Sequence, residues 1–273
     1  MGVTQQGQAA RHLTVQPMGG AGAATCAPAE AATPALRRET LRDLAAAGVM
    51  VLACGAAIAA WVGFGADAAL RAAFVYAVGA CFVWRGLAAH PHARFGAANR
   101  ITLLRFALAA VLAALVGEPT ARGAAAAWAV VVVATLAALL DAADGPLARR
   151  SGLASAFGAR FDMETDAWFT LVLCALVVHF DKAGAWVLAS GLMRYAFVAA
   201  AWALPWLAAP LPPSRRRQAV CVAQITALIV CLGPVVPRPA ASLLAALALA
   251  ALAASFAADL YRLARRRHLE TER

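Results

Sequence analysis

The sequence predicts an all-α fold, a polytopic bundle of helices embedded in a membrane. Of its 273 residues, 63% are hydrophobic and only 14% are charged. Soluble domains are instead about 45–50% apolar and about 25% charged. The mean hydropathy is +0.72. Runs rich in Ala, Val and Leu also approach the roughly 20 residues that a membrane-spanning helix needs.

The apolar runs predict about eight membrane spans, separated by short loops that contain Gly, Pro or charged residues. Ahead of them, residues 1–40 are biased toward Ala, Gly, Pro and Thr, so we expect a disordered tail there. The spans are expected near residues 44–64, 68–87, 101–117, 123–143, 156–179, 184–208, 218–236 and 240–262.

Basic residues alternate along the chain, and this alternation predicts the orientation in the membrane. The net charge of +10 comes almost wholly from Arg, which clusters before the first span and after every second one. Cytoplasmic loops carry such an excess, so we expect both termini and residues 141–150 to be cytoplasmic. Because these arginines lie in short loops, no nucleic-acid partner is expected. The other side carries only Arg71, Arg122, Lys182 and Arg238.

Two pairs of acidic residues stand out in this apolar chain. Asp141 and Asp144 lie three residues apart, and Asp162 and Asp166 lie four apart, with Gly158 one turn before them. On helices each pair shares one face, and the short polar turn between them makes the helices antiparallel neighbours. Converging carboxylates in a medium of low dielectric constant need a cation. Oxygen ligands without His or Cys favour Mg²⁺ or Mn²⁺, and two ions would balance four carboxylates.

The residues after the first acidic pair predict a phosphate ligand. Gly145 and Ala148 are small enough for a ligand to approach the backbone closely, and Arg149 offers a guanidinium suited to a diphosphate. A pair of metal ions clamps phosphate oxygens in such sites. From the residues alone, we therefore expect a metal-bound diphosphate.

These residues resemble the signature of the CDP-alcohol phosphotransferase (CDP-alcohol phosphatidyltransferase) family. The match runs Asp141-x-x-Asp144-Gly145-x-x-Ala148-Arg149, then eight residues, then Gly158-x-x-x-Asp162-x-x-x-Asp166. Upstream, the segment 99–105, NRITLLR, resembles the family's N-x-(I/L)-T-x-x-R pattern. The resemblance implies a six-helix core over 99–265, two additional transmembrane helices over 41–98, and a basic cytoplasmic tail over 266–273.

The resemblance implies a membrane enzyme of phospholipid biosynthesis. The Ala- and Arg-rich composition is compatible with a GC-rich bacterial genome, so we expect the inner membrane as its location. The enzyme would transfer a phosphatidyl group from a CDP-alcohol, CDP-diacylglycerol first, to a small alcohol and release CMP. A homodimer is also implied. By this resemblance Asp141, Asp144 and Asp162 bind the metals, and Asp166 is a further ligand or the general base. The nucleotide and its diphosphate would contact Asn99, Thr102, Gly145, Ala148, Arg149 and Gly158.

Two intramembrane arginines carry further expectations, since such residues pair with an acid or face a cavity. Arg105 is either a structural partner of the site carboxylates or a ligand. Arg194 resembles a basic residue that binds the phosphate of the acceptor, which favours glycerol 3-phosphate. Met163 and Ala167 stand where glycerol-3-phosphate members often have Pro and Lys. Inositol phosphate, serine and a CDP-choline-type reaction therefore remain open.

Two other classes of protein stay as alternatives. A UbiA-type prenyltransferase also uses aspartates and a diphosphate, but it needs a second Asp-rich motif, which this chain lacks. A non-catalytic cation-binding membrane protein would not require Gly145, Ala148 and Arg149 at their offsets. Outside the motif, Glu164 falls on another side of its helix. The histidines His90, His92 and His179 are expected to be solvated or without a specific role.

Overall fold

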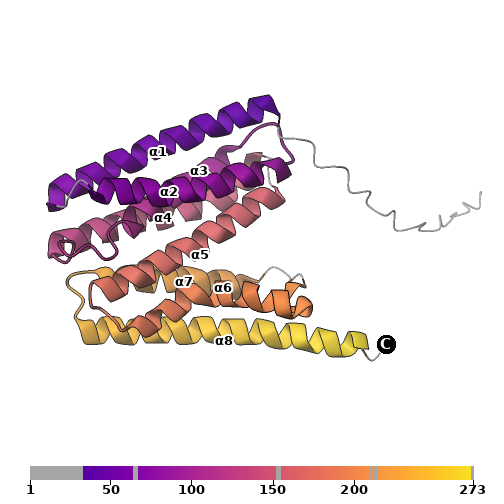
Figure 1. Ribbon diagram of the computed structural model, residues 1–273. Coiled ribbons are helices and arrows are strands. Elements are labelled where there is room, and N and C mark those ends of the chain that lie inside the picture. The colour runs from indigo at the N-terminus through magenta and orange to yellow at the C-terminus, as the bar shows by residue number, and fades with distance from the viewer. Residues whose placement is uncertain (1–32, 64–66, 152–154, 210, 212–213, 272–273) are drawn as a thin grey trace, which may run out of the picture. The chain divides into compact units, whose positions relative to one another are not determined.

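The computed structural model describes residues 33–63, 67–151, 155–209, 211 and 214–271, without the side chains of 62, 142–151, 208 and 267–271. Within these ranges the chain is all-α, as predicted, and each expected span corresponds to one helix (Figure 1). The α-helices are α1 Pro34–Val62, α2 Asp67–Gly86, α3 Ala97–Ala113, α4 Ala124–Ser151, α5 Ala156–His179, α6 Leu188–Ala203, α7 Arg215–Leu232 and α8 Arg238–Thr271. Short 3₁₀ helices are η1 Leu87–Ala89, η2 Ala185–Val187 and η3 Pro205–Ala208.

Five of the described helical segments are long and apolar enough to cross a membrane, and they support the predicted multi-pass protein. The remaining helices α3, α5 and α7 are not among them. Helix α5 is instead the centre of the larger apolar core, where Leu173 and Leu176 are fully buried. The five segments are Pro34–Trp61, Asp67–Ala89, Ala124–Asp141, Ala185–Ala203 and Arg238–Arg266.

Helix α1 begins at Pro34, before residue 44, near which the first span was expected to start. The local sequence explains this early start. Pro34 occupies the first turn, where its missing N–H costs nothing, and the Thr33 side chain accepts a hydrogen bond from the Leu36 backbone N–H at 3.3 Å. Leu36 is only 1% exposed, so packing adds to the cap. Residues 1–32 of the expected tail lie outside the description.

Helices α1 and α2 form a hairpin that packs on α3 (Figure 1). A second apolar core lies between these three helices, and the Tyr76 hydroxyl on α2 donates a hydrogen bond to the Leu44 carbonyl on α1 at 2.7 Å. Because a buried hydroxyl without a partner is costly, this bond fixes how the two helices pair. The hairpin therefore lies directly against the helix that carries Asn99, Thr102 and Arg105.

The helices alternate in direction, so the bundle has two ends. We call the end where α1 begins, α4 ends, α5 begins and α8 ends the basic end. The opposite end holds the end of α1, the start of α2 and the loops 114–123, 180–187 and 233–237. The arginine clusters lie at the basic end. The alternation of basic loops along the sequence therefore appears in the structure as a difference in positive charge between the two ends of the bundle.

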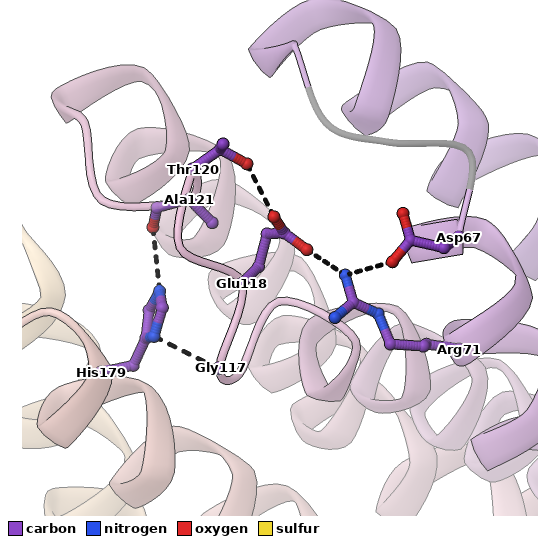
Figure 2. Close-up of polar contacts among 7 residues, drawn as sticks. All are labelled: Asp67, Arg71, Gly117, Glu118, Thr120, Ala121 and His179. Carbon is purple, nitrogen blue, oxygen red and sulfur yellow. Dashed lines mark hydrogen bonds and ion pairs between the residues drawn. The ribbon is translucent and has the colours of Figure 1, made fainter.

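Figure 2 shows a polar network that ties α2 to the loop 114–123 at the opposite end. Arg71 on α2 forms ion pairs with Glu118 and with Asp67, the latter at 3.4 Å, and Thr120 donates a hydrogen bond to Glu118 at 2.8 Å. The hydrogen bond from Arg71, followed by that from Thr120, holds the pKa of Glu118 below its usual range. Glu118 therefore stays ionised at neutral pH, and its ion pair with Arg71 fastens the hairpin to the core.

His179, the last residue of α5, holds the loop 114–123 in place, whereas the sequence predicted no specific role for it. The Gly117 backbone N–H donates to its Nδ1 at 3.3 Å, and its Nε2 donates to the Ala121 carbonyl at 3.1 Å (Figure 2). This pattern requires the neutral ring, with one acceptor and one donor nitrogen. His179 therefore connects the end of α5 to the loop between α3 and α4.

Gly191 on α6 allows the closest approach between α6 and α5. A Cβ atom at this position would lie 2.6 Å from the Leu171 Cα, which is backbone and cannot move aside alone. We expect Gly191→Ala to destabilise the protein by about 1–3 kcal/mol through overpacking. The measurement is thermal unfolding in detergent. Gly123→Ala is the matched control, because nothing lies within 4 Å of a Cβ at Gly123. Equal unfolding temperatures for the two variants would contradict this account.

Candidate active site

Three helices bring the candidate site residues together near the basic end. Asp141 follows the apolar run of α4, and Asp162 and Asp166 lie one turn apart on α5. Ser155 fixes the start of α5, because its side chain accepts a hydrogen bond from the Gly158 backbone N–H at 3.0 Å. The sequence predicts that α4 and α5 pack directly on each other, but both helices pack on α3 and on α7 instead of extensively on each other, and ligand oxygens of the three carboxylates meet between them.

The guanidinium of Arg105, from α3, lies among these three carboxylates. Its Nη1 is 2.8 Å from Asp141 Oδ1 and 2.6 Å from Asp162 Oδ1, and its Nη2 pairs with Asp166. Arg105 is only 3% exposed. A buried guanidinium with this many donors is the side chain best suited to hold several carboxylates at once. Of the two roles expected for Arg105, the structure places it in that of a partner to the carboxylates.

The three carboxylates fit a divalent cation. Asp141, Asp162 and Asp166 each offer a ligand oxygen, and these atoms all lie within 4.8 Å of one another. Hard oxygen donors of this kind suit Mg²⁺ or Mn²⁺. Three negative charges and one positive charge from Arg105 leave a net charge of −2, which one divalent cation would neutralise.

The other half of the motif is placed only by its backbone. Residues 142–151 continue helix α4 without interruption to Ser151. Their side chains lie outside the described part of the structure, so the predicted metal and diphosphate contacts of this half remain predictions. These residues are Asp144, Gly145, Ala148 and Arg149.

The remaining expected nucleotide residues lie on α3 and α5. Asn99 and Thr102 are buried, and the Thr102 hydroxyl donates to the Ala98 carbonyl of its own helix at 3.1 Å. Gly158 faces Asn99: a Cβ at Gly158 would lie 2.7 Å from Asn99 Oδ1. Glycine is therefore needed at 158 for a close approach between α3 and α5, a reason that spacing along one chain cannot reveal.

Arg194 lies on α6 and pairs with a carboxylate outside the motif. It donates to Glu164 Oε1 on α5 at 2.6 Å. The position of Glu164 around its helix predicted that it lies outside the site, and the structure pairs it with Arg194. That position could not reveal that this other face of α5 meets α6. The arginine expected to bind the acceptor is thus positioned by Glu164.

His90 was expected to be solvated, and the structure corrects this. Its side chain is only 7% exposed and packs against the Phe157 ring, with 5.2 Å between ring centroids. Asn99 donates to it across 3.2 Å. The burial arises because η1 turns the chain back onto the start of α5. The sequence carries only a weak signal for this contact, which is that His90 lies nine residues before Asn99.

Comparison with known proteins shows the family of the chain. The chain matches the family model described as CDP-alcohol phosphatidyltransferase over residues 95–257, more than half of its 273 residues. No curated protein and no solved structure matches it. The match includes the three converging aspartates, Arg105 and Arg194, and it leaves out the α1–α2 hairpin. The chain therefore belongs to the CDP-alcohol phosphatidyltransferase family.

Proposed function

We propose that this protein transfers a phosphatidyl group from CDP-diacylglycerol to a small alcohol and releases CMP, as a step of phospholipid biosynthesis. The observation that carries the proposal is the family match over residues 95–257, within which three aspartates converge around Arg105. Glycerol 3-phosphate is the favoured acceptor because of Arg194. Inositol phosphate, serine and a CDP-choline-type reaction are the alternatives.

The carboxylates would hold two divalent ions, Mg²⁺ or Mn²⁺, with Asp141, Asp144 and Asp162 as ligands and Asp166 as a further ligand or the general base. When bound, these ions would draw negative charge from the phosphate oxygens and so stabilise the transition state. Two divalent ions and Arg105 carry five positive charges against four carboxylates. The resulting net charge of +1 favours an anionic diphosphate, and Arg149 would add a bidentate donor.

The reaction itself would need one proton acceptor. The acceptor alcohol gives its hydroxyl proton to an oxygen of Asp166, and the alcohol oxygen forms a bond to the β-phosphorus. The bond from that phosphorus to the bridging oxygen breaks, and its electron pair leaves with CMP. Arg105 would keep Asp166 aimed at the acceptor, because its Nη2 holds this carboxylate in place. Asn99, Thr102, Gly145, Ala148 and Gly158 would line the nucleotide pocket.

The same proposal covers location and assembly. The basic end would face the cytoplasm, because cytoplasmic loops carry the arginine excess. Both termini and the active site would then lie on the cytoplasmic side of an inner membrane. A homodimer is proposed on the family resemblance alone.

The proposal is tested with purified protein in vesicles that contain labelled CDP-diacylglycerol. Glycerol 3-phosphate, inositol phosphate, serine and a diacylglycerol plus CDP-choline mixture are offered separately, and the lipid products are resolved. We expect CMP and one new phospholipid in equal amounts with one of these acceptors. A prenyl diphosphate is included for the prenyltransferase alternative, which would release pyrophosphate. No CMP from any CDP-alcohol would overturn the proposal.

Arg194 gives a prediction about the acceptor. We expect Arg194→Gln to raise the KM for a phosphorylated acceptor about tenfold or more, since a charge-assisted hydrogen bond to phosphate is lost. The KM for CDP-diacylglycerol should stay the same. Steady-state kinetics with each substrate varied in turn measures both. Arg238→Gln is the control, because Arg238 pairs with Asp181 at the opposite end. Equal KM values for the two variants would show that Arg194 does not bind the acceptor.

A further inference from the structure

His90 is supplied by a segment that the family match does not include. It follows the 3₁₀ helix η1 and precedes residue 95, where the match begins. The segment is nevertheless built into the core. A Cβ at Gly86, just before η1, would lie 3.0 Å from the Phe157 ring, and the His90 ring packs edge-on against the same ring. The segment that follows the α1–α2 hairpin thus brings a histidine to the first turn of α5.

The His90 ring holds one side of the Asn99 amide. Asn99 Nδ2 donates to the Phe95 carbonyl at 2.5 Å and lies 3.2 Å from His90 Nε2. An amide nitrogen can only donate, so Nε2 must be the unprotonated acceptor. The proton is then on Nδ1, which lies 3.1 Å from the His92 carbonyl oxygen. This tautomer satisfies the contacts with Asn99 and with the His92 carbonyl, but its Nδ1 cannot accept from the His92 backbone N–H, which lies 3.2 Å from it.

These contacts fix which way the Asn99 amide points. With its nitrogen held by His90 and Phe95, its oxygen faces Gly158, one turn before Asp162 on α5. Asn99 is 5% exposed, and a buried amide that lost these partners would rotate to find others. A rotated amide would present donors where the acceptor oxygen now lies. A nucleotide hydroxyl or amine, which donates, would then lose its partner.

We infer that His90 is a positioning residue that orients the Asn99 amide for the nucleotide of the CDP-alcohol. The inference rests on the proposed function, in which Asn99 lines the nucleotide pocket. It extends the working site of this protein beyond the family core to the segment that follows α2.

Protonation should break the arrangement. Burial is the main cause that lowers the pKa of His90 from 6.5. The positive charge of His92 also lowers it, whereas the hydrogen bond to the His92 carbonyl and the charge of Glu39 raise it. Neutral His90 is therefore the form at pH 7. At lower pH, Nε2 would become a donor that faces another donor. The stability linked to this group is lost as pH falls from 6.5 toward its lower folded-state pKa.

The test compares three variants of the full-length protein in vesicles. His90→Phe keeps a ring against Phe157 but removes the acceptor, and His90→Gln restores an acceptor oxygen at the position of Nε2. His92→Phe is the matched control in the same loop. We expect His90→Phe to raise the KM for the CDP-alcohol and the Kd for CMP about tenfold, with kcat little changed. His90→Gln should recover most of this loss, and His92→Phe should behave as wild type.

A double mutant isolates the route through Asn99. In an Asn99→Ala background, His90→Phe should have no further effect on the Kd for CMP, because the group that it positions is gone. The inference is overturned if His90→Phe leaves KM and Kd unchanged, if His90→Gln is as impaired as His90→Phe, or if the two losses add. A wild-type protein that neither binds CMP nor releases it would refute the proposed function, and this inference with it. Normal wild-type turnover with unaffected His90 variants would refute the inference alone.

Discussion

Asp166→Asn should abolish the release of CMP while leaving the fold intact. The amide has nearly the shape of the carboxylate but cannot take a proton from the acceptor hydroxyl. Loss of a general base costs about 10²–10⁴-fold in rate, and loss of a charged metal ligand adds to this. Release of CMP from labelled CDP-diacylglycerol measures the effect. Helix content by circular dichroism and the unfolding temperature report on the fold.

The matched control for this variant is Asp181→Asn. Asp166 lies inside α5, whereas Asp181 lies in the loop after α5 at the opposite end, pairs with Arg238 and has a backbone φ of 55°. Asparagine tolerates that left-handed conformation, so the control changes only charge. We expect wild-type rates from it. If Asp166→Asn retained the wild-type rate, the assignment of Asp166 as the base would be wrong.

Of the substitutions proposed for this protein, Arg105→Met should cause the largest decrease in the free energy of unfolding. It removes the guanidinium that lies among Asp141, Asp162 and Asp166, which is itself 3% exposed, and it leaves three partly exposed carboxylates close together without a positive charge from it. Removal of one partner from a buried ion pair costs about 3–5 kcal/mol. Thermal unfolding in detergent with a chelator present measures this. Added Mg²⁺ should raise the unfolding temperature of the variant more than that of wild type, because the ion replaces the lost positive charge.

Arg100→Met is the control on the same helix. Arg100 pairs with Glu39 and Asp43, but its side chain is 50% exposed. Exposed pairs of this type contribute less than about 1 kcal/mol. The role of Arg105 would be contradicted if Arg105→Met and Arg100→Met unfolded at the same temperature. It would also be contradicted if added Mg²⁺ did not reduce the difference in unfolding temperature between Arg105→Met and wild type.

The sequence predicted the bounds of a helix well where capping or turn residues flank its apolar run. Helix α5 runs over 156–179, as expected, because Ser155 caps its start and a polar turn follows its end. The early start of α1 was missed, since Leu36 lies among charged residues and the apolar run begins later. Its burial comes from contacts with other helices, which hydropathy along one segment does not reveal.

The candidate site could be predicted only in part, because spacing along a helix shows which residues share a face but not what that face contacts. The spacing of Asp141, Asp162 and Asp166 places them on facing helices, and the structure brings them together. The partner role of Arg105 was among the expectations from the sequence, whereas two other side-chain contacts between elements were not predictable. The Arg194–Glu164 pair and the His90–Asn99 contact depend on which helix faces pack together, and local periodicity does not determine that.

The central claim is that carboxylates on α4 and α5 hold divalent cations that support transfer from a CDP-alcohol. The most direct test measures CMP release by the wild-type protein from CDP-diacylglycerol and the preferred acceptor, before and after treatment with a chelator. We expect release to stop with the chelator and to return when Mg²⁺ or Mn²⁺ is added in excess. Release that continued at the same rate in the chelator would contradict the claim.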